Sequence, residues 1–416
     1  MAEVDVVLAG MAHRDRTPSW LWPGGKIPYI VDESYTAEEK ATLKNVMNEW
    51  ETKTDHVIHF QEIPNPKDYP LKMGGHLLRI LKQGNGCNAD MGRLTNLWEN
   101  QAAESWALFA AACLRDRPSM LHELGHVIGL WHEHNRWDRD LYIKVYRKNI
   151  RDDSWDGYTV GVTKHPGLGE LVGDDIGFYD FESIMHYGYI NGHSIVVSTA
   201  GSCPQGGEAV IDNGEYRCKV MEPRADVKLS QWAITGISEG DIEAVKFLYS
   251  FDIEKDRDIP GWDYADFSMR PGDDHRVCQK ACAADVRCDA YTFVDEYVIK
   301  NSLPRCYLKR GDIPAKSVAR TGMISGRRIK KYGSPSLGVA QHIRYVGANK
   351  NTFEIKEGTR PPRYCRELCE KDKDCVAFTF IEPSFKNKNS YCHLKGNLDF
   401  KLEYDDQAYS ATIRSK

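Results

Sequence analysis

The sequence lacks a basic excess and lacks a long hydrophobic run. Its 55 Lys and Arg residues face 60 Asp and Glu residues, which gives a net charge of −5 at pH 7. A nucleic-acid-binding chain needs a cationic surface to neutralise phosphates, so this balance excludes nucleic acid as the partner class. The longest purely apolar run, Ala107 to Leu114, is too short to cross a bilayer, so we expect no membrane span.

Two marks of the secretory route are also missing. Residues 1–5 show neither the basic nor the apolar region of a signal peptide, and the sequence contains no Asn-x-Ser/Thr acceptor for N-glycosylation. Twelve cysteines point the other way, because an even number at regular spacings indicates disulfides and an oxidising compartment. We therefore expect a secreted protein whose signal peptide is not present in this chain.

An internal repeat organises the second part of the chain. The spacing C-x3-C-x5-C-x17-C, which begins at Cys278, recurs as C-x3-C-x5-C-x16-C from Cys365. Two small modules are therefore expected, residues 251–332 and residues 333–416. Within each module, cysteines at i and i+4 fall on one face of a helix, and the stretch Ala290–Val294 predicts a short buried strand. A metal site is the alternative interpretation of these cysteines, but metal sites usually have cysteine pairs with C-x2-C spacing.

The residues before the repeat mix strand and helix patterns. A capping box begins at Thr36, and the apolar stripe of an amphipathic helix follows it. Strands are expected at Lys26–Val31, His56–Gln61 and His76–Leu81. This part of the chain is therefore expected to be an α+β domain.

The pattern H-E-x-x-H-x-x-G-x-x-H carries the chemistry. On a helix, His122 and His126 lie one turn apart on one face, so both imidazoles reach a single ion. Gly129 lets the chain leave the helix in a left-handed turn, which brings His132 back as a third ligand. Three histidines leave a coordination position open for water, and Glu123 is placed to take a proton from that water.

The residues after His132 resemble those of the astacin zinc metallopeptidases, a metzincin family. Glu133 follows the third histidine, as in that family, and Ser183-Ile-Met-His-Tyr187 matches the family's Met-turn. The resemblance covers roughly residues 13–250. It implies an endopeptidase with one Zn²⁺ per chain and a protein or peptide substrate lying antiparallel to an edge strand.

The same resemblance assigns the site residues. His122, His126 and His132 would hold zinc, and Glu123 would be the general base and then the acid to the leaving amine. Tyr187 would be a fifth ligand that leaves the metal to hydrogen-bond the oxyanion. Met185 would lie beneath the zinc, and Gly129 and Glu133 would be structural. The basic residue of the pocket after the scissile bond would be one of Arg217, Lys219 and Arg224.

The repeated modules resemble the PAN/apple family, a helix packed on an antiparallel sheet. That family's nested pairing implies the disulfides Cys278–Cys306, Cys282–Cys288, Cys365–Cys392 and Cys369–Cys375. The astacin resemblance implies the pair Cys87–Cys113, and Cys203–Cys218 is expected to close a local loop. Modules of this kind are expected to fold alone and to bind protein or glycan. A chain ending near Ser250 should therefore still cleave short peptides.

Three departures from these families stand out. The astacin disulfide between the end of the first long helix and the end of the catalytic domain is absent, because residues 53–56 and 247–251 contain no cysteine. Residues 1–12 precede the expected start of the domain and read as a tag or a propeptide remnant, in which Asp5 belongs to a solvated tail. The family's trimmed N-terminus would lie near Glu133. The basic run Arg327–Lys331 reads as a solvated linker end.

These patterns predict an α+β chain. Its metzincin/astacin-like catalytic domain has a twisted N-terminal sheet, an active-site helix and a C-terminal sub-lobe, and two small disulfide-rich PAN/apple modules follow it. The alternative is a binding or adhesion protein in which the protease lobe is a scaffold that does not cleave.

Overall fold

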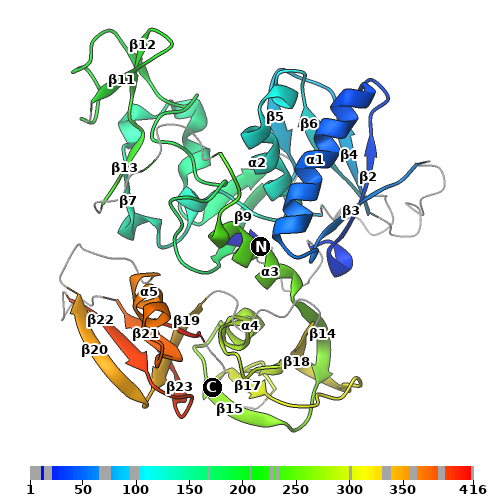
Figure 1. Ribbon diagram of the computed structural model, residues 1–416, viewed down its shortest axis with the longest axis vertical. Coiled ribbons are helices and arrows are strands. Elements are labelled where there is room, and N and C mark those ends of the chain that lie inside the picture. Colours follow the sequence, from blue (N-terminus) through cyan, green and yellow to red (C-terminus); the bar gives the residue numbers. More distant parts are fainter. Residues whose placement is uncertain are drawn as a thin grey trace. The chain divides into compact units, whose positions relative to one another are not determined.

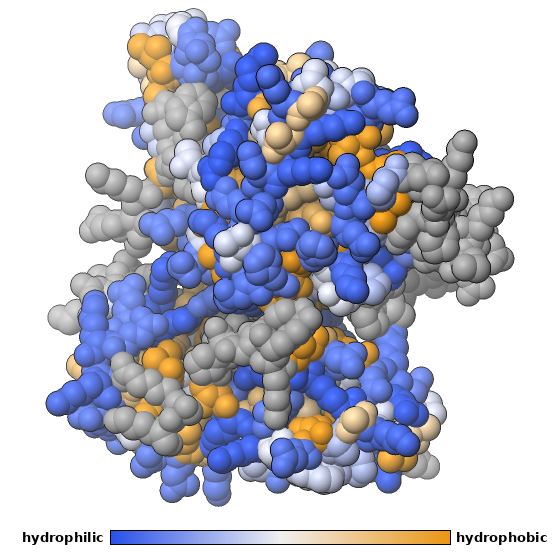
Figure 2. Space-filling view, turned by 45° about the vertical axis from the view of Figure 1, so that its right-hand side comes forward, coloured by the Kyte–Doolittle hydropathy of each residue, from blue (hydrophilic) through white to orange (hydrophobic). Residues whose placement is uncertain are grey.

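The computed structural model of the chain divides into two compact units, Met1–Tyr249 (unit 1) and Ser250–Lys416 (unit 2) (Figure 1). It describes residues 11–13, 21–64, 76–93, 103–165, 169–206, 208–224, 229, 235–298, 302–329, 339–355, 363–382 and 389–413. No helix among these residues is long and apolar enough to span a membrane. The face shown in Figure 2 is mostly hydrophilic, and its apolar side chains form small separate patches.

A five-stranded sheet forms the first half of unit 1. Its strand order is β3-β2-β4-β6-β5, in which all pairs are parallel except β5–β6. The strands are β2 (Lys26–Val31), β3 (His59–Glu62), β4 (His76–Leu81), β5 (Cys87–Ala89) and β6 (Ala103–Phe109). The expected strand at His56 begins three residues later, because Asp55 and His56 adopt positive φ angles of 54° and 58° and turn the chain first.

Two helices pack on this sheet and on each other. Helix α1 (Ala37–Lys53) begins with the expected capping box, in which Thr36 and Glu39 bond each other's backbone N–H groups. Its apolar stripe is buried, and Trp50 donates from Nε1 to the carbonyl of Leu121 in α2 (Arg117–Ile128) at 3.0 Å. This bond fixes the position of α1 against the helix that carries the histidines.

The rest of unit 1 is built from short elements. Its strands are β1 (Met11–His13), β7 (Ile143–Val145), β8 (Val162–His165), β9 (Gly169–Asp175), β10 (Val196–Val197), β11 (Ala209–Asp212), β12 (Glu215–Cys218) and β13 (Met221–Pro223). They form the sheets β1-β9-β8, β10-β12-β11 and β13-β7. The 3₁₀ turns η6 (Glu133–Asn135) and η9 (Asp152–Tyr158) contact each other beside the site.

Helix α3 (Glu239–Tyr249) closes unit 1 at the place where the family disulfide is missing. An ion pair joins Asp55 to Lys246, the residue before the second cysteine-free segment, but the Asp55 carboxylate is exposed, so the pair contributes little. The buried hydroxyl of Tyr249 donates to the carbonyl of Ile128 at 2.7 Å. The end of α3 is therefore held mainly by its hydrogen bond to α2.

The end of the N-terminal extension differs from a solvated tail. Residues 11–13 form strand β1, which pairs antiparallel with β9, so that Met11 lies opposite Asp175. Asp5 and the other residues up to 10 lie outside the described residues. The trimmed N-terminus that the family resemblance implies would fall near His13, which pairs with Gly173 in β9.

Unit 2 contains two modules of one design, residues 250–329 (module 1) and residues 339–413 (module 2). Module 1 has the antiparallel sheet order β14-β18-β16-β17-β15, and module 2 has the order β19-β23-β21-β22-β20. The bounds in module 1 are β14 (Phe251–Asp258), β15 (Asp263–Ser268), α4 (His275–Ala284), β16 (Ala290–Val294), β17 (Arg305–Lys309) and β18 (Val318–Arg328). Those in module 2 are β19 (Ala340–Val346), β20 (Asn349–Ile355), α5 (Arg363–Lys371), β21 (Ala377–Ile381), β22 (Ser390–Lys395) and β23 (Lys401–Thr412).

The two modules are not independent. Helix α4 of module 1 packs on β19 of module 2, and buried Lys280 donates to the side chain of Gln341 at 2.9 Å. Thr412 of module 2 donates to the carbonyl of Ala284 at 3.1 Å. The Arg287 guanidinium lies 4.4 Å from the ring centroid of Phe400. The modules therefore share a buried contact that the sequence analysis did not expect, and whether each module folds alone stays a prediction.

The basic run at the end of module 1 also differs from expectation. Arg327 and Arg328 belong to β18 rather than to a linker. Arg327 forms an ion pair with Glu254, and half-buried Arg328 donates to the carbonyls of Cys282 and Ala283. Arg328 therefore satisfies carbonyls at the C-terminus of α4, where a cation is favourable. The lysines at 330 and 331 lie outside the described residues.

Candidate metal centre

Helix α2 presents the first two histidines. Asp116 caps its N-terminus, a proline occupies its first turn, and Gly129 ends it in a left-handed conformation with φ of 115°. Only glycine adopts this angle without Cβ strain, so the chain turns sharply and returns toward the helix. His122 and His126 project from successive turns, and His132 follows the turn to join them.

The three imidazole rings point their Nε2 atoms toward one another. The Nε2 atom of His132 lies 3.2 Å from Nε2 of His122 and 3.2 Å from Nε2 of His126. The Nδ1 atoms of His122 and His126 donate to the carbonyls of Ile184 and Leu130, at 2.8 and 2.7 Å. Since carbonyls only accept, these bonds place the proton on Nδ1 and leave the Nε2 lone pairs facing one another.

This cluster fits a zinc ion. Burial lowers the pKa values of all three histidines, that of His126 to about 3, so the imidazoles are neutral and able to ligate. Three neutral nitrogens with facing lone pairs repel one another unless a cation lies between them. His122, His126 and His132 are the one group of potential ligands of this kind within the described residues. Three nitrogens with an open fourth position match catalytic zinc.

Glu123 lies in the wall of the same site. Burial raises the pKa of its carboxyl to about 8, and a hydrogen bond from the backbone of Ala89 in β5 partly offsets this rise. A cation at the three Nε2 atoms would lower the pKa of Glu123 again, because an opposite charge favours the ionised form. The geometry thus places a carboxylate with an adjustable proton affinity between the metal ligands and the edge strand.

The turn at residues 183–187 supports the ligands from below. Met185 is 1% exposed, and a Cβ at Gly125 would lie 2.6 Å from its sulfur, so only glycine in α2 leaves room for it. The carbonyl of Met185 accepts from the backbone N–H of Glu133 at 3.1 Å. The turn is therefore packed against both the active-site helix and the segment after His132.

Asp241 of α3 anchors this turn. Its carboxylate accepts hydrogen bonds from the Ser183 hydroxyl at 2.6 Å and from the Ile184 backbone N–H at 2.8 Å. The carbonyl of Ile184 in turn accepts from His122. Asp241 therefore acts on the orientation of a metal ligand through two hydrogen bonds.

Tyr187 lies among aromatic rings beside the third histidine. Its ring centroid is 4.4 Å from that of His132 and 4.3 Å from that of His134. Tyr158 and His193 meet it edge-on, at 6.0 and 5.6 Å. Burial raises the pKa of Tyr187, so its hydroxyl is a hydrogen-bond donor at neutral pH.

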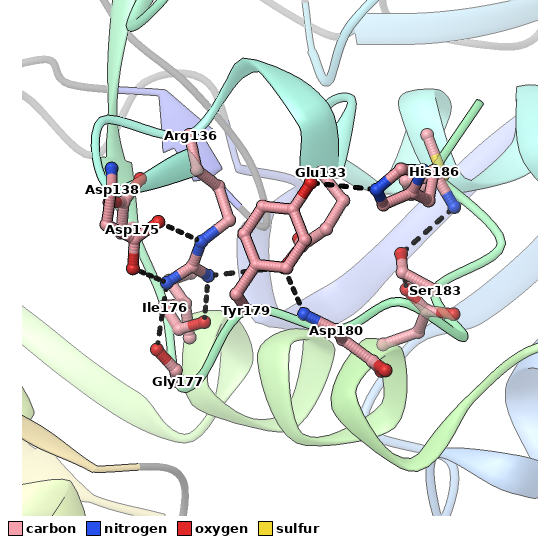
Figure 3. A network of polar contacts seen from close by, with 12 residues as sticks. Glu133, Arg136, Asp138, Asp175, Ile176, Gly177, Tyr179, Asp180, Ser183 and His186 are labelled. Carbon is pink, nitrogen blue, oxygen red and sulfur yellow. Dashed lines mark hydrogen bonds and ion pairs between the residues drawn. The ribbon is translucent and has the colours of Figure 1, made fainter. Parts of the chain in front are cut away.

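Glu133 belongs to a buried polar network rather than to the metal ligands (Figure 3). It is 3% exposed, accepts from the backbone N–H of Asp180 at 2.7 Å, and lies 3.5 Å from the Arg136 guanidinium. Arg136 also forms a two-pronged pair with Asp138 and donates to the carbonyl of Ile176 at 3.0 Å. The cationic partner of Glu133 in this structure is therefore Arg136, three residues further along the same segment.

The three basic candidates for the substrate pocket differ in their partners. Arg217 forms ion pairs with Asp212 and Glu215 in the β11–β12 hairpin, so its charge is locally neutralised. Arg224 donates to the carbonyl of Ile143 at 3.3 Å. The ammonium of Lys219 lies 5.4 Å from the ring centroid of Tyr189.

The structure joins the twelve cysteines in six disulfides. The pairs are the six that the sequence analysis expects: Cys87–Cys113, Cys203–Cys218, Cys278–Cys306, Cys282–Cys288, Cys365–Cys392 and Cys369–Cys375. The first disulfide joins β5 to the segment before α2. It therefore constrains the strand that lies beside Glu123.

Sequence reasoning missed four residues that shape the site: Gly125, His134, His193 and Asp241. Asp241 had a detectable signal, because Ser238 and Asp241 form a capping box at the start of α3. His134 directly follows Glu133, and its Nδ1 accepts a hydrogen bond from the backbone N–H of Tyr187 at 3.3 Å. Nothing in the local sequence marks His193.

Three convergent imidazoles, an adjacent carboxylate and a methionine turn define the class of a zinc-dependent metallopeptidase. Residues 14–203 match the model of the family Astacin (Peptidase family M12A), and residues 257–309 and 345–395 match that of the PAN domain. The first unit therefore contains an astacin peptidase domain, and the second contains two segments that match the PAN domain.

Several known proteins are similar to this chain. Tolloid-like protein 1 of Homo sapiens is 30% identical over 44% of this chain and 17% of its own length. Zinc metalloproteinase nas-8 of Steinernema carpocapsae is 32% identical over 40% of this chain and 34% of its own length. These matches thus span about a third or less of each curated relative. The solved high choriolytic enzyme 1 of Oryzias latipes, a hatching enzyme zinc-protease, aligns over 57% of this chain and 98% of its own at 22% identity and a TM-score of 0.40.

Proposed function

We propose that this chain is a secreted endopeptidase that hydrolyses peptide bonds in protein or peptide substrates. The observation that carries the proposal is the convergence of three Nε2 atoms beside the buried carboxyl of Glu123. Zinc held by His122, His126 and His132 would supply Lewis acidity, which polarises the scissile carbonyl and lowers the pKa of water. The expectation of secretion rests on the six disulfides, which persist in oxidising compartments.

Glu123 is the proposed general base. Its carboxylate takes a proton from the attacking water and passes it to the nitrogen of the leaving amine. The hydrogen bond from Ala89 fixes the carboxyl beside β5, where an extended substrate would add to the free edge of the sheet. In this arrangement the scissile carbonyl lies within reach of both Glu123 and the metal ligands.

Tyr187 is the proposed oxyanion donor. Its protonated hydroxyl would hydrogen-bond the negative charge that develops on the carbonyl oxygen, inside a buried site where such a bond is worth several kcal/mol. The ring approaches His132 closely enough for the hydroxyl to serve as a further ligand in the resting state. The two roles exclude each other at any instant, which makes the hydroxyl a switchable group.

The substitution Glu123→Gln tests the mechanism. The amide keeps the size of the side chain but cannot take a proton. We expect a folded protein with one zinc per chain by atomic spectroscopy and a loss of peptide cleavage of about 10³-fold or more. Glu182→Gln, which changes an exposed carboxylate before the methionine turn, is the matched control and should leave cleavage unchanged. Equal activity of Glu123→Gln and the unchanged protein would refute the assignment.

The PAN modules are proposed to bind a protein or glycan target. Two sites on one rigid unit raise the local concentration of the peptidase at a polymeric substrate. A chain ending near Ser250 should then cleave short peptides at nearly the full-length rate but act more slowly on an immobilised protein. The alternative, a scaffold that does not cleave, predicts zinc at one per chain and no cleavage of casein or of a peptide library.

A further inference from the structure

We propose that His193 is a positioning residue for Tyr187, a role that rests on the proposed peptidase function. His193 lies outside the recognised motifs. Its imidazole meets the Tyr187 ring edge-on, with centroids 5.6 Å apart and planes at 70°. It also meets the Tyr158 ring, at 5.7 Å and 78°.

Tyr187 lies in a slot lined by four rings. The His132 and His134 rings are tilted against it at 4.4 and 4.3 Å, and the Tyr158 and His193 rings meet it edge-on at 6.0 and 5.6 Å. Tyr158 also contacts His134 at 5.3 Å and His193 at 5.7 Å, so the lining rings pack on one another. This packing limits how far the Tyr187 ring can tilt, and therefore where its hydroxyl can point.

The wall that contains His193 is held in place by a hydrogen-bonded turn. The side-chain amide of Asn191 donates to the Tyr158 hydroxyl at 2.7 Å, and its oxygen accepts from the backbone N–H of His193 at 2.9 Å. The carbonyl of His193 accepts from the backbone N–H of Arg151 at 3.0 Å. One asparagine thus links both outer rings of the slot and fixes their spacing.

The contact between His193 and Tyr187 is a ring contact. The Nδ1 atom of His193 is buried and has no hydrogen-bond partner within the described part of the chain. Any influence of His193 on Tyr187 through Nδ1 is therefore absent among these residues, and the edge-on ring contact remains. A flat apolar ring at position 193 would keep that contact.

The test combines two substitutions at His193 with one at Tyr187. His193→Ala removes the wall, and His193→Phe keeps a flat ring without nitrogens. We expect His193→Ala to lower kcat about three- to tenfold with little change in KM, since an aromatic contact is lost. His193→Phe should restore most of kcat. In a Tyr187→Phe background, His193→Ala should have no further effect, because its action passes through the Tyr187 hydroxyl.

A second readout does not depend on activity. In the metal-free protein with ¹³C-labelled tyrosine rings, Tyr187 is assigned by the signal missing in Tyr187→Phe, and we expect its ring to flip faster in His193→Ala than in the unchanged protein. An unchanged flip rate, an equal loss of kcat in the Tyr187→Phe background, or a change in KM alone would each overturn the proposal. If no variant cleaves any peptide, the proposed function fails while the flip rate still decides the role of His193.

Discussion

Asp241 accepts a hydrogen bond from the hydroxyl of Ser183 at 2.6 Å, although 58 positions separate them in the chain. The bond joins the last helix of unit 1 to the turn that carries Met185. Burial raises the pKa of Asp241 to about 6, and the hydrogen bond from Ser183 opposes this rise. Asp241 also accepts a hydrogen bond from the backbone N–H of Ile184, whose carbonyl accepts from His122. Asp241 therefore supports the orientation of a metal ligand.

The first prediction concerns this anchor. Asp241→Ala should lower zinc affinity about 10- to 100-fold, because the support of His122 loses its own hydrogen bonds. Competition with a chromophoric chelator measures the affinity. Glu239→Ala, at an exposed position in the same helical turn, is the control and should bind zinc normally. A zinc affinity unchanged by Asp241→Ala would show that His122 is oriented without the turn.

The second prediction concerns Tyr187. Tyr187→Phe should retain zinc and keep KM nearly constant while kcat falls roughly 10²-fold, the usual cost of losing one oxyanion donor. Steady-state kinetics on a fluorogenic peptide separate the two constants. A variant that changes only KM would assign Tyr187 to substrate binding.

The third prediction uses a difference between the modules. Lys309 of module 1 pairs with the carboxylate of Asp263 and donates to the carbonyl of Gly261. Its counterpart Lys395 is 1% exposed and meets the amide of Asn349 instead. Burial, with a smaller effect of Arg344, lowers the pKa of Lys395 to about 8.

The sign of the pH effect follows from this shift. Between pH 8 and 10.5 the folded chain binds fewer protons at Lys395 than the unfolded chain, so this group should make stability rise with pH, by up to about 3 kcal/mol. Asn349→Asp supplies the carboxylate that module 1 already has, and should remove the rise. Urea unfolding of the full chain at several pH values measures it. Equal slopes for both proteins would contradict a buried ammonium whose partner is an amide rather than a carboxylate.

The fourth prediction concerns the segments that lack the family disulfide. Tyr249→Phe leaves the Ile128 carbonyl without its donor and should lower the free energy of unfolding by about 1–3 kcal/mol. Asp55→Asn breaks only an exposed ion pair and should cost less than about 1 kcal/mol. Chemical denaturation of both variants gives the comparison. The reverse order would mean that the ion pair, and not the tyrosine, replaces the disulfide.

The fifth prediction concerns the cooperativity of unit 2. Arg287→Ala removes a ring contact and a donor to the carbonyl of Leu398, both across the boundary between modules. We expect hydrogen exchange to rise together in β16 and β21, because each module depends on the other. Exchange that rises in β16 alone would show that the modules unfold separately.

The sequence predicted the parts of the site whose geometry is local. The histidine spacing, the glycine that ends α2 and the capping box of α1 all act within one or two helical turns, so pattern and structure agree. The supports of the site could not be predicted in this way. Asp241, Asp180 and Ile184 reach their partners across tens of residues, and only the fold brings them together.

The same reason explains the errors in unit 2. The basic run at Arg327 looked like a solvated linker because charge patterns describe only composition, whereas Arg328 bonds carbonyls at the end of a helix. The modules looked self-sufficient because their disulfides close within each repeat. Lys280 and Arg287 are ordinary surface residue types, and nothing in their local sequence indicates that a second module covers them.

Helix α5 differs from α4 on the face that α4 buries against module 2. Ala283 and Ala284 of α4 are fully buried, and the corresponding residues of α5, Glu370 and Lys371, are exposed. A further module that docked on α5 in the way module 2 docks on α4 would have to remove both charges from water. A duplicated copy of module 2 would therefore not pack on α5 as module 2 packs on α4. Replacing Glu370 and Lys371 by alanine would be the first step toward a module to which further copies can be added.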